Sequence, residues 1–255
     1  VSFYLFIPLG LAVFWLWWWY ATDEPSAHPT MSHNELAEIE AGRDALTPHV
    51  GSGAWTQLIR DRNTLILAAA YFAENFIFYL FFTWFFHYLV SELGFSILET
   101  GFLASLPWLC GAVMASVGGY LCDTLCAKFG PRLGCRVPAI TGLVGAGIFL
   151  YLGLYSSSPY VAVALLSLCF ASTQFTEGAY WSAQTYVAGP YTAPACGVMN
   201  TGGNLAGIVV APLMPFLAGH IGWVAALSTG SIMAFVGAAL WLFIRPDEPF
   251  QPQSK

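Results

Sequence analysis

Seven long apolar segments constrain this chain more than any other feature of its sequence. A helix needs about 20 residues to cross a hydrocarbon core of about 30 Å. Only 9% of the 255 residues are charged, against about 25% in a soluble domain. The sequence therefore predicts an all-α, multi-pass membrane protein. Its seven transmembrane helices are expected at approximately residues 2–21, 65–90, 97–122, 137–156, 160–187, 195–219 and 222–244.

The basic residues predict the orientation of these helices. If the seven segments alternate in direction, all eight Lys and Arg residues lie on one side: Arg43, Arg60, Arg62, Lys128, Arg132, Arg136, Arg245 and Lys255. Cytoplasmic loops carry the excess of Lys and Arg. We therefore expect connection 22–64 and the C-terminus to be cytoplasmic, in a plasma or bacterial inner membrane. Val1 is then outside, and from a start without Met or signal peptide we expect a fragment; a cleaved signal peptide is the alternative.

Residues 22–64 form the only long polar connection and divide the chain. We expect a helix over 1–21, this connection, a six-helix bundle over 65–245 and a tail over 246–255. Seven of the 14 Asp and Glu residues lie in the connection, so we interpret the net charge of −6 as a solvated loop. No nucleic-acid partner is expected. Ser32 and Glu35 have the S-x-x-E spacing of a capping box, which predicts a short amphipathic helix.

Glu177 lies in the middle of an otherwise uncharged apolar segment. A carboxylate at the membrane centre costs about 2.5–3.5 kcal/mol even on lenient insertion scales. At about 100° per residue, Gln174, Glu177, Trp181 and Gln184 fall within about 80° of one another on a helix. We expect this polar stripe to face the bundle interior or a water-filled cavity and to contact a ligand; a structural hydrogen-bond cluster is the alternative.

Two other predicted helices also carry polar residues within their apolar segments. Glu74 and Asn75 lie in the second, where Tyr71 and Asn75 share one side. Asn200 and Asn204 lie one turn apart in the sixth, so both amides project the same way. Amides in hydrocarbon need hydrogen-bonding partners, which a neighbouring helix or a polar ligand can supply. We therefore predict that three helices contribute to one polar site.

A different pattern follows the third predicted helix. Gly119 and Asp123 have a G-x3-D spacing, and we expect the helix to end there. An acid at a helix C-terminus is unfavourable unless it is compensated, and Lys128 and Arg132 follow closely. We predict that this charged segment latches one conformation; charges that only set the topology are the alternative.

The six cysteines do not indicate a disulfide framework. Cys110, Cys169 and Cys196 fall within apolar segments, where a free Cys behaves as a small hydrophobic residue. The others lie on the predicted cytoplasmic side, where thiols stay reduced. Their C-x3-C spacing plus a third Cys lacks the paired spacing or His of zinc sites, so we predict no metal and no cofactor for Cys122, Cys126 and Cys135.

Four stretches resemble a known family. They are "FFTWFFHYLVSELGFS", "GFLASLPWLCGAVMASVGGYLCD", "TEGAYWSA" and "GVMNTGGNLAGIVVAPLMPFLAGHIGW". Together with the G-x3-D motif they resemble the anion:cation symporter branch of the major facilitator superfamily. The likeness extends over nearly the whole chain and is weakest in the central connection.

This resemblance implies that the chain is helix 6, the central loop and the C-terminal six-helix half of a secondary transporter. Such a carrier is not an enzyme; it moves a small organic anion, such as a sugar acid, by alternating access with H⁺ or Na⁺ as coupling cation. Trp181 and Asn200 fall at positions resembling the family's substrate contacts. Because they are expected to face the bundle interior, we add five polar residues as candidate substrate contacts: Gln174, Glu177, Asn204, Tyr71 and Asn75. Glu177 and Glu74 are the candidates for proton coupling. The partners implied are the lipid bilayer, the anion, the cation and the missing N-terminal half, which in this branch holds most of the residues that neutralise the anion.

Other functions remain open at this point. Seven helices with an outside start also describe a receptor or sensor, although the last segment has no Lys for a retinal Schiff base. A truncated carrier without transport activity is a further alternative. An intramembrane enzyme is disfavoured because no G-x-S-G or G-x-G-D stretch occurs inside a segment.

Overall fold

The computed structural model describes residues 2–44 and 57–251, which belong to two compact units. The predicted outside position of Val1 and the basic Lys255 fall outside the described residues. All regular elements in the described ranges are helices. The first unit holds the described residues up to 44 and the second those from 57 onward.

The first unit consists of α1 (Ser2–Tyr20), the short 3₁₀ turn η1 (Pro25–Ala27) and α2 (His33–Asp44). The predicted capping box starts α2: the Ser32 hydroxyl donates to the Glu35 carboxylate at 2.7 Å and accepts from the Glu35 N–H at 3.3 Å. The hydrogen bonds from Ser32 hold the pKa of Glu35 below its usual value. The prediction of a helix within the polar connection is thus confirmed.

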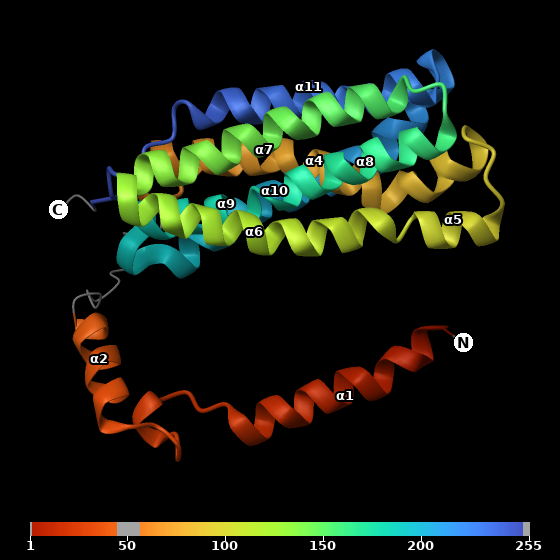
Figure 1. Cartoon of the computed structure of the whole chain (residues 1–255). Coiled ribbons are helices and arrows are strands. Elements are labelled where there is room, and N and C mark those ends of the chain that lie inside the picture. Colours follow the sequence, from red (N-terminus) through yellow and green to blue (C-terminus); the bar gives the residue numbers. More distant parts are fainter. Residues whose placement is uncertain (1, 45–56, 252–255) are drawn as a thin grey trace. The chain divides into compact units, whose positions relative to one another are not determined.

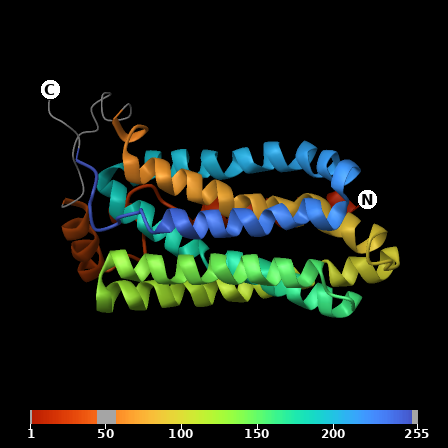
Figure 2. The same ribbon diagram turned by 90° about the horizontal axis from the view of Figure 1, so that it is seen from above.

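The second unit is a bundle that the chain traverses lengthwise, reversing after α4, α6, α7, α9 and α10 (Figures 1 and 2). A two-residue break at Ala104–Ser105, just before Pro107, separates α5 from α6. The elements are α4 (Arg62–Ser91), α5 (Ile97–Leu103), α6 (Leu106–Phe129), α7 (Pro131–Leu154), α8 (Pro159–Gln174), α9 (Glu177–Ala188), η2 (Gly189–Tyr191), α10 (Thr192–Ile221) and α11 (Trp223–Trp241).

Five stretches are long and apolar enough to cross a membrane. One of them, Pro159–Ile221, contains two of the expected segments, because the chain reverses at η2. A shorter apolar stretch, Phe6–Tyr20, lies within α1. The apolar helices are those of a multi-pass membrane protein and lie where the hydropathy pattern places them.

The helix ends differ from expectation on both sides of Gly130. We expected a helix to end at 122 and the next to begin at 137, but α6 continues to Phe129 and α7 begins at Pro131. Hydropathy falls at Asp123, yet the chain has no stop signal until Gly130, whose φ of +81° favours glycine. Proline then suits the first turn of α7. Asp123 therefore lies inside a helix, which corrects the expectation that the helix ends there.

The basic residues of the second unit gather at one end of the bundle. The Arg136 guanidinium donates to the Ile244 carbonyl at 2.6 Å, and Arg132 lies 3.7 Å from the Asp247 carboxylate. At the start of α4, Asn63 accepts from the Arg245 N–H at 3.1 Å. These contacts bring the start of α4, the turn at Gly130 and the segment after α11 together, as alternating helices require.

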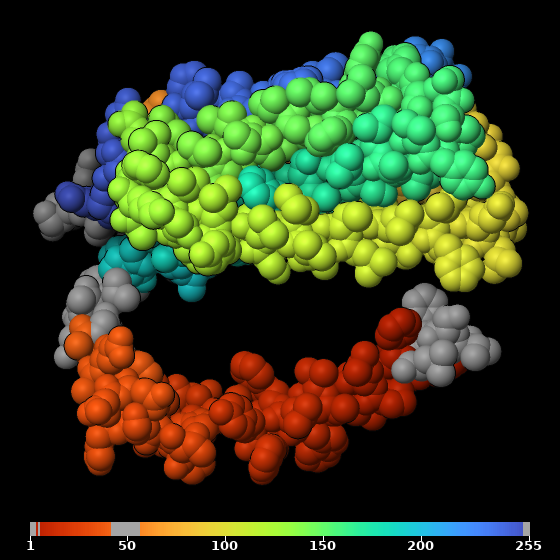
Figure 3. All heavy atoms as spheres, in the orientation of Figure 1, coloured from red at the N-terminus to blue at the C-terminus, as the bar shows by residue number. Residues whose placement is uncertain are grey.

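Backbone contact joins α6 to the junction of α8 and α9. A side chain at Gly118 would overlap the backbone carbonyl of Phe175, and a Cβ at Gly178 would lie 2.7 Å from the Gly119 Cα. Small residues allow helices in membranes to approach this closely. The side chains of α6, α7 and α8 close against one another on the face shown in Figure 3.

We predict that Gly118→Ala destabilises the protein by about 1–3 kcal/mol, because overpacking against backbone cannot be relieved by rotating a side chain. Gly119→Ala is the matched control: its Cβ meets nothing within 4 Å, and alanine favours a helix by up to about 1 kcal/mol. Thermal unfolding in detergent measures both. Equal stability of the two variants would contradict the close crossing.

Candidate functional site

The break between α8 and α9 places Glu177 at the first position of a helix. The Thr173 and Thr176 hydroxyls each donate to the carbonyl three residues earlier, at 2.7 Å. Such bonds compete with the helical ladder and bend helices. Glu177 begins α9, where the helix dipole favours a negative charge. The local sequence thus offsets part of the cost of a carboxylate in this segment.

Glu177 forms a cluster with one residue of its own helix and one of α4. Its carboxylate accepts from the Trp181 indole N–H at 2.8 Å and from the Tyr71 hydroxyl at 3.3 Å. The Tyr71 and Trp181 rings meet edge-on, with centroids 6.1 Å apart. Trp181 is 39% exposed, so the cluster opens onto the surface of the bundle. The structure therefore brings together three residues that the sequence analysis selected on two separate helices.

The second carboxylate of α4 lies deeper. Glu74 is 1% exposed and accepts from the Asn75 amide at 2.9 Å, while its other oxygen has no hydrogen-bond partner. The Asn75 amide also donates to the Tyr71 carbonyl at 3.0 Å. Asn75 thus connects Glu74 to the Tyr71 and Glu177 cluster.

Helix α10 covers this part of α4 with a row of small residues. A Cβ at Gly203 would lie 2.6 Å from the Tyr71 ring and 2.9 Å from the Asn75 amide nitrogen. One turn further on, a Cβ at Gly207 would lie 2.8 Å from the Tyr79 ring. The absence of side chains at these two positions lets Tyr71, Asn75 and Tyr79 lie against the backbone of α10.

The two asparagines of α10 extend the site along the same helix. The Tyr79 hydroxyl donates to the Asn204 side-chain oxygen at 2.7 Å, and the Asn204 amide donates to the Asn200 carbonyl at 2.8 Å. Both asparagines are exposed. Sequence reasoning missed Tyr79, although it follows Tyr71 and Asn75 at four-residue spacing. Eight residues on three helices form what we call the polar network: Tyr71, Glu74, Asn75, Tyr79, Glu177, Trp181, Asn200 and Asn204.

The two glutamines do not join this network through a hydrogen bond. Gln174 ends α8 before the break, and its side chain packs against Gly111 of α6. Gln184 is fully buried and neither of its amide atoms has a partner. The predicted stripe assumed one continuous helix, and the break at residues 175–176 separates Gln174 from it. Gln184 is on α9 with Glu177 but is buried within the bundle.

Asp123, Lys128 and Arg132 lie toward the basic end of the bundle, whereas Gly119 lies against Gly178, next to Glu177 of the polar network. Gly119 and Asp123 are within α6, Lys128 is in its last turn, and Arg132 is in the first turn of α7. Arg132 pairs with Asp247. Within the described part of the chain, Asp123 is exposed and has no ion pair, so the expected compensation by Lys128 or Arg132 is absent.

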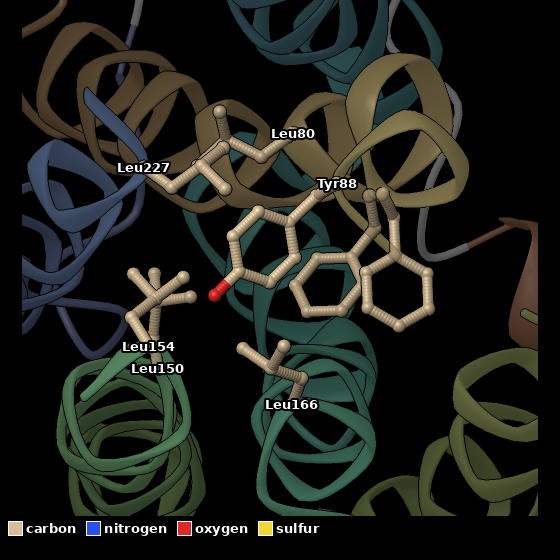
Figure 4. Close-up of a pocket in the computed structure, with 8 residues that line it drawn as sticks. Leu80, Tyr88, Leu150, Leu154, Leu166 and Leu227 are labelled. Atoms are coloured by element: carbon tan, nitrogen blue, oxygen red, sulfur yellow. The ribbon is translucent and has the colours of Figure 1, made fainter. Parts of the chain in front are cut away.

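A small cavity of about 20 Å³ lies among the apolar side chains of the bundle. Its lining includes Leu80, Leu150, Leu154, Leu166, Leu227 and Tyr88, whose hydroxyl points toward Leu150 and Leu154 (Figure 4). This volume holds about one water molecule. The cavity is therefore too small for an organic substrate, and the polar network remains the candidate site.

Chemically, the polar network offers hydroxyl, indole and amide donors beside two carboxyl groups. Hydroxyl and amide groups of this kind recognise the hydroxyls and carboxylate oxygens of a polar ligand. None of the side chains in the network is cationic. The network can therefore orient a polar ligand, whereas the charge of an anion needs a partner elsewhere.

Comparison with known proteins decides the family. The sequence matches the Major Facilitator Superfamily over residues 1–133 and again over 124–255. The chain belongs to this superfamily. Similar proteins include the probable galactarate/D-glucarate transporter GudP of Bacillus subtilis, which is 33% identical over 254 residues that cover 92% of this chain and 53% of GudP. The hexuronate transporter of the same organism is 27% identical, covering 96% of this chain and 58% of its own length.

Human sialin is 28% identical over 210 residues, which cover 81% of this chain and 42% of sialin. Together, these relatives confirm the resemblance of this major facilitator chain to the anion:cation symporter branch. The chain spans about half the length of the curated relatives it matches.

Tyr71 and Tyr180 pack against each other, but only Tyr71 belongs to the polar network. Tyr180 is fully buried and donates to the Ala70 carbonyl at 3.0 Å, and its ring centroid lies 5.0 Å from that of Tyr71. We predict that Tyr180→Phe lowers the free energy of unfolding by about 0.5–1.5 kcal/mol, because it leaves a buried carbonyl without this donor. Tyr71→Phe should cost less, since the single hydroxyl proton of Tyr71 is shared between both Glu177 carboxylate oxygens at a long 3.3 Å. Thermal unfolding of both variants checks this, and a larger loss for Tyr71→Phe would contradict it.

Proposed function

We propose that this chain is part of a cation-coupled symporter that moves a small organic anion, such as a sugar acid, across a cell membrane. In this proposal α1 is the sixth helix of the complete protein and connection 22–64 is its central cytoplasmic loop. The helices from α4 to α11 form its C-terminal half. The observation that carries the proposal is the polar network on three helices of a chain whose relatives are organic-anion transporters.

The position of the network suggests how it would work. Carriers of this superfamily bind substrate between two halves near the bilayer midplane and rock to expose it to either side. Glu177, Trp181 and the two asparagines of α10 are accessible at the surface of the bundle, whereas Tyr71 and Glu74 are buried behind them. We assign substrate orientation to the accessible members. The buried members hold them in place.

The absence of a cationic side chain in the network favours a two-half arrangement. An anion in a low-dielectric site needs a positive partner or a dense set of donors. The network supplies neutral donors only, so we assign the positive partner to the N-terminal half of the complete protein. Glu177 and Glu74 are the groups in the network that can accept a proton, and the Tyr71 hydroxyl donates to the Glu177 carboxylate. They are the candidates for coupling to H⁺; Na⁺ coordination by the same carboxylates is the alternative.

We predict that Glu177→Gln lowers uptake of labelled glucarate or hexuronate by about tenfold to a hundredfold, because hydrogen bonds to a charged group contribute about 1.5–3 kcal/mol. Trp181→Phe, which keeps an aromatic ring but removes the N–H that binds Glu177, should reduce uptake in the same direction. The assay uses the complete protein, including its N-terminal half, in liposomes with an imposed pH gradient. If Glu177 couples protons, Glu177→Gln also loses the dependence of uptake on that gradient.

Glu92→Gln is the matched control for this test, since Glu92 follows the end of α4 and is exposed. It should transport like the unmodified protein. Unchanged uptake and unchanged pH dependence in both Glu177→Gln and Trp181→Phe would reject the assignment of these residues.

A second prediction concerns the latch. Because Asp123 has no ion pair among the described residues, we assign its latch contact to the other conformation of the transport cycle. Asp123→Asn should then slow transport by at least about fivefold, the lower end of typical coupling between conformational states, while substrate affinity stays within about twofold. Glu248→Gln, which alters an exposed acid at the same end of the bundle, is the control. Transport rate and equilibrium binding are measured separately on the complete protein. An equal effect of both variants on rate would indicate a general charge effect and contradict a specific role of Asp123.

A further inference from the structure

Three of the six cysteines meet between two helices at the end of the bundle. Cys122 and Cys126 lie one turn apart on α6, and Cys135 is in the second turn of α7. Their sulfur atoms are 3.7 Å (Cys126–Cys135), 4.0 Å (Cys122–Cys126) and 4.0 Å (Cys122–Cys135) apart. We call these three residues the thiol cluster.

The spacing of the sulfur atoms suits one metal ion. A point equidistant from three atoms so separated lies about 2.3 Å from each, which is the length of a zinc–thiolate bond. Burial in the bundle removes cysteine side chains from water, but it does not require three sulfur atoms to lie about equally far from one another. The arrangement therefore fits ligation without movement of the backbone.

A glycine produces this convergence. Any side chain at Gly134 would overlap the backbone and the sulfur of Cys126. The absence of a Cβ there lets α6 and α7 approach each other where the thiols meet. Gly134 directly precedes Cys135, so the same turn of α7 supplies both the close approach and the third sulfur.

Helix α9 adds oxygen atoms to the surroundings of the cluster. The Ser182 hydroxyl lies near the Cys122 thiol, and the Tyr186 hydroxyl lies near the Cys126 thiol. A tetrahedral zinc ion with three thiolates takes one further ligand, such as a hydroxyl or water oxygen. Three sulfur ligands also suit copper(I), because soft thiolates select both ions.

Access to the cluster comes from one side. Cys122 and Cys135 are fully buried, whereas Cys126 is partly exposed near the last turn of α6. This end of the bundle carries Lys128, Arg132 and Arg136, and the basic residues predict that it faces the cytoplasm, where thiols are reduced and available as ligands.

We propose that Cys122, Cys126 and Cys135 form a three-thiolate site for a thiophilic metal ion, zinc(II) or copper(I), which ties α6 to α7 beside α9. On binding, three S–H bonds are replaced by three metal–sulfur bonds and the three protons leave to solvent, so no oxidant is needed. The sequence analysis predicted no metal here, because a C-x3-C pair plus a third Cys lacks the paired spacing or His of zinc sites; the proposal rests on the positions of the sulfur atoms. The thiol cluster shares no residue with the polar network to which substrate binding is assigned.

Metal binding to the purified chain in detergent tests the proposal. The reduced, metal-free protein is titrated with zinc(II) alone and with copper(I) alone, and bound metal is counted after desalting. We expect about one ion per chain. Cys135→Ser should weaken binding by at least about tenfold, since even the loss of a residue that only supports a ligand costs 10–100-fold. Cys169→Ser, which changes an equally buried cysteine outside the cluster, should bind like the unmodified chain.

X-ray absorption at the metal edge provides a second measurement. Three sulfur neighbours near 2.3 Å are expected, with an additional oxygen for zinc. A chain with Cys110, Cys169 and Cys196 all changed to Ser should retain this spectrum, whereas Cys126→Ser, a change at the partly exposed position, should lose a sulfur even if Cys135→Ser does not fold. Absence of stoichiometric binding, undiminished binding by the cluster variants, fewer than three sulfur neighbours, or a disulfide within the cluster would overturn the proposal.

Discussion

The contact between the backbones of α6 and the α8–α9 junction is the constraint on which the rest of this bundle depends. Gly118 lies against the Phe175 carbonyl, and Gly119 lies against Gly178, so no side chain separates the helices there. In a membrane, association of helices relies on close packing more than on the hydrophobic effect. Because the contact falls at the break between α8 and α9, it also fixes where α9 begins. The position of Glu177 follows from that start.

Glycines also allow a close approach between helices on the other side of the candidate site. Gly203 and Gly207 of α10 receive the rings of Tyr71 and Tyr79, and Asn75 lies between those rings on α4. The side chains of the polar network are thus held between two glycine-lined contacts. A scaffold of this kind can keep carboxyl, amide and indole groups in fixed positions at low cost in side-chain entropy. That property suits a site that must bind a polar ligand without a cationic residue of its own.

Helix α9 connects the two sites that the structure suggests. Trp181 of the polar network and Ser182 beside the thiol cluster are consecutive residues of this helix. An ion bound by the thiol cluster would stiffen the contact between α6 and α7 that α9 rests on. The latch residues Gly119 and Asp123 lie on the same stretch of α6 as Cys122. Conformational control and metal binding would therefore act on one part of the bundle.

By itself, the sequence determined the class of protein and the order of its helices. Hydropathy and segment length are local properties, so the apolar helices and the capping box at Ser32 were predicted correctly, and the common face of Glu177 and Trp181 could be read from their spacing of one turn. The family resemblance was also readable from contiguous stretches.

Only the tertiary structure decided which groups from different helices meet: Tyr71 with Glu177, Tyr79 with Asn204, and Cys135 with Cys122 and Cys126. The break before Glu177 and the continuation of α6 past Asp123 also escaped prediction, because helix ends inside a bundle depend on packing against neighbours and on the next residue able to adopt positive φ. Periodicity gives the direction of a side chain on its own helix, whereas its partner is set by how closely the glycines allow two helices to approach.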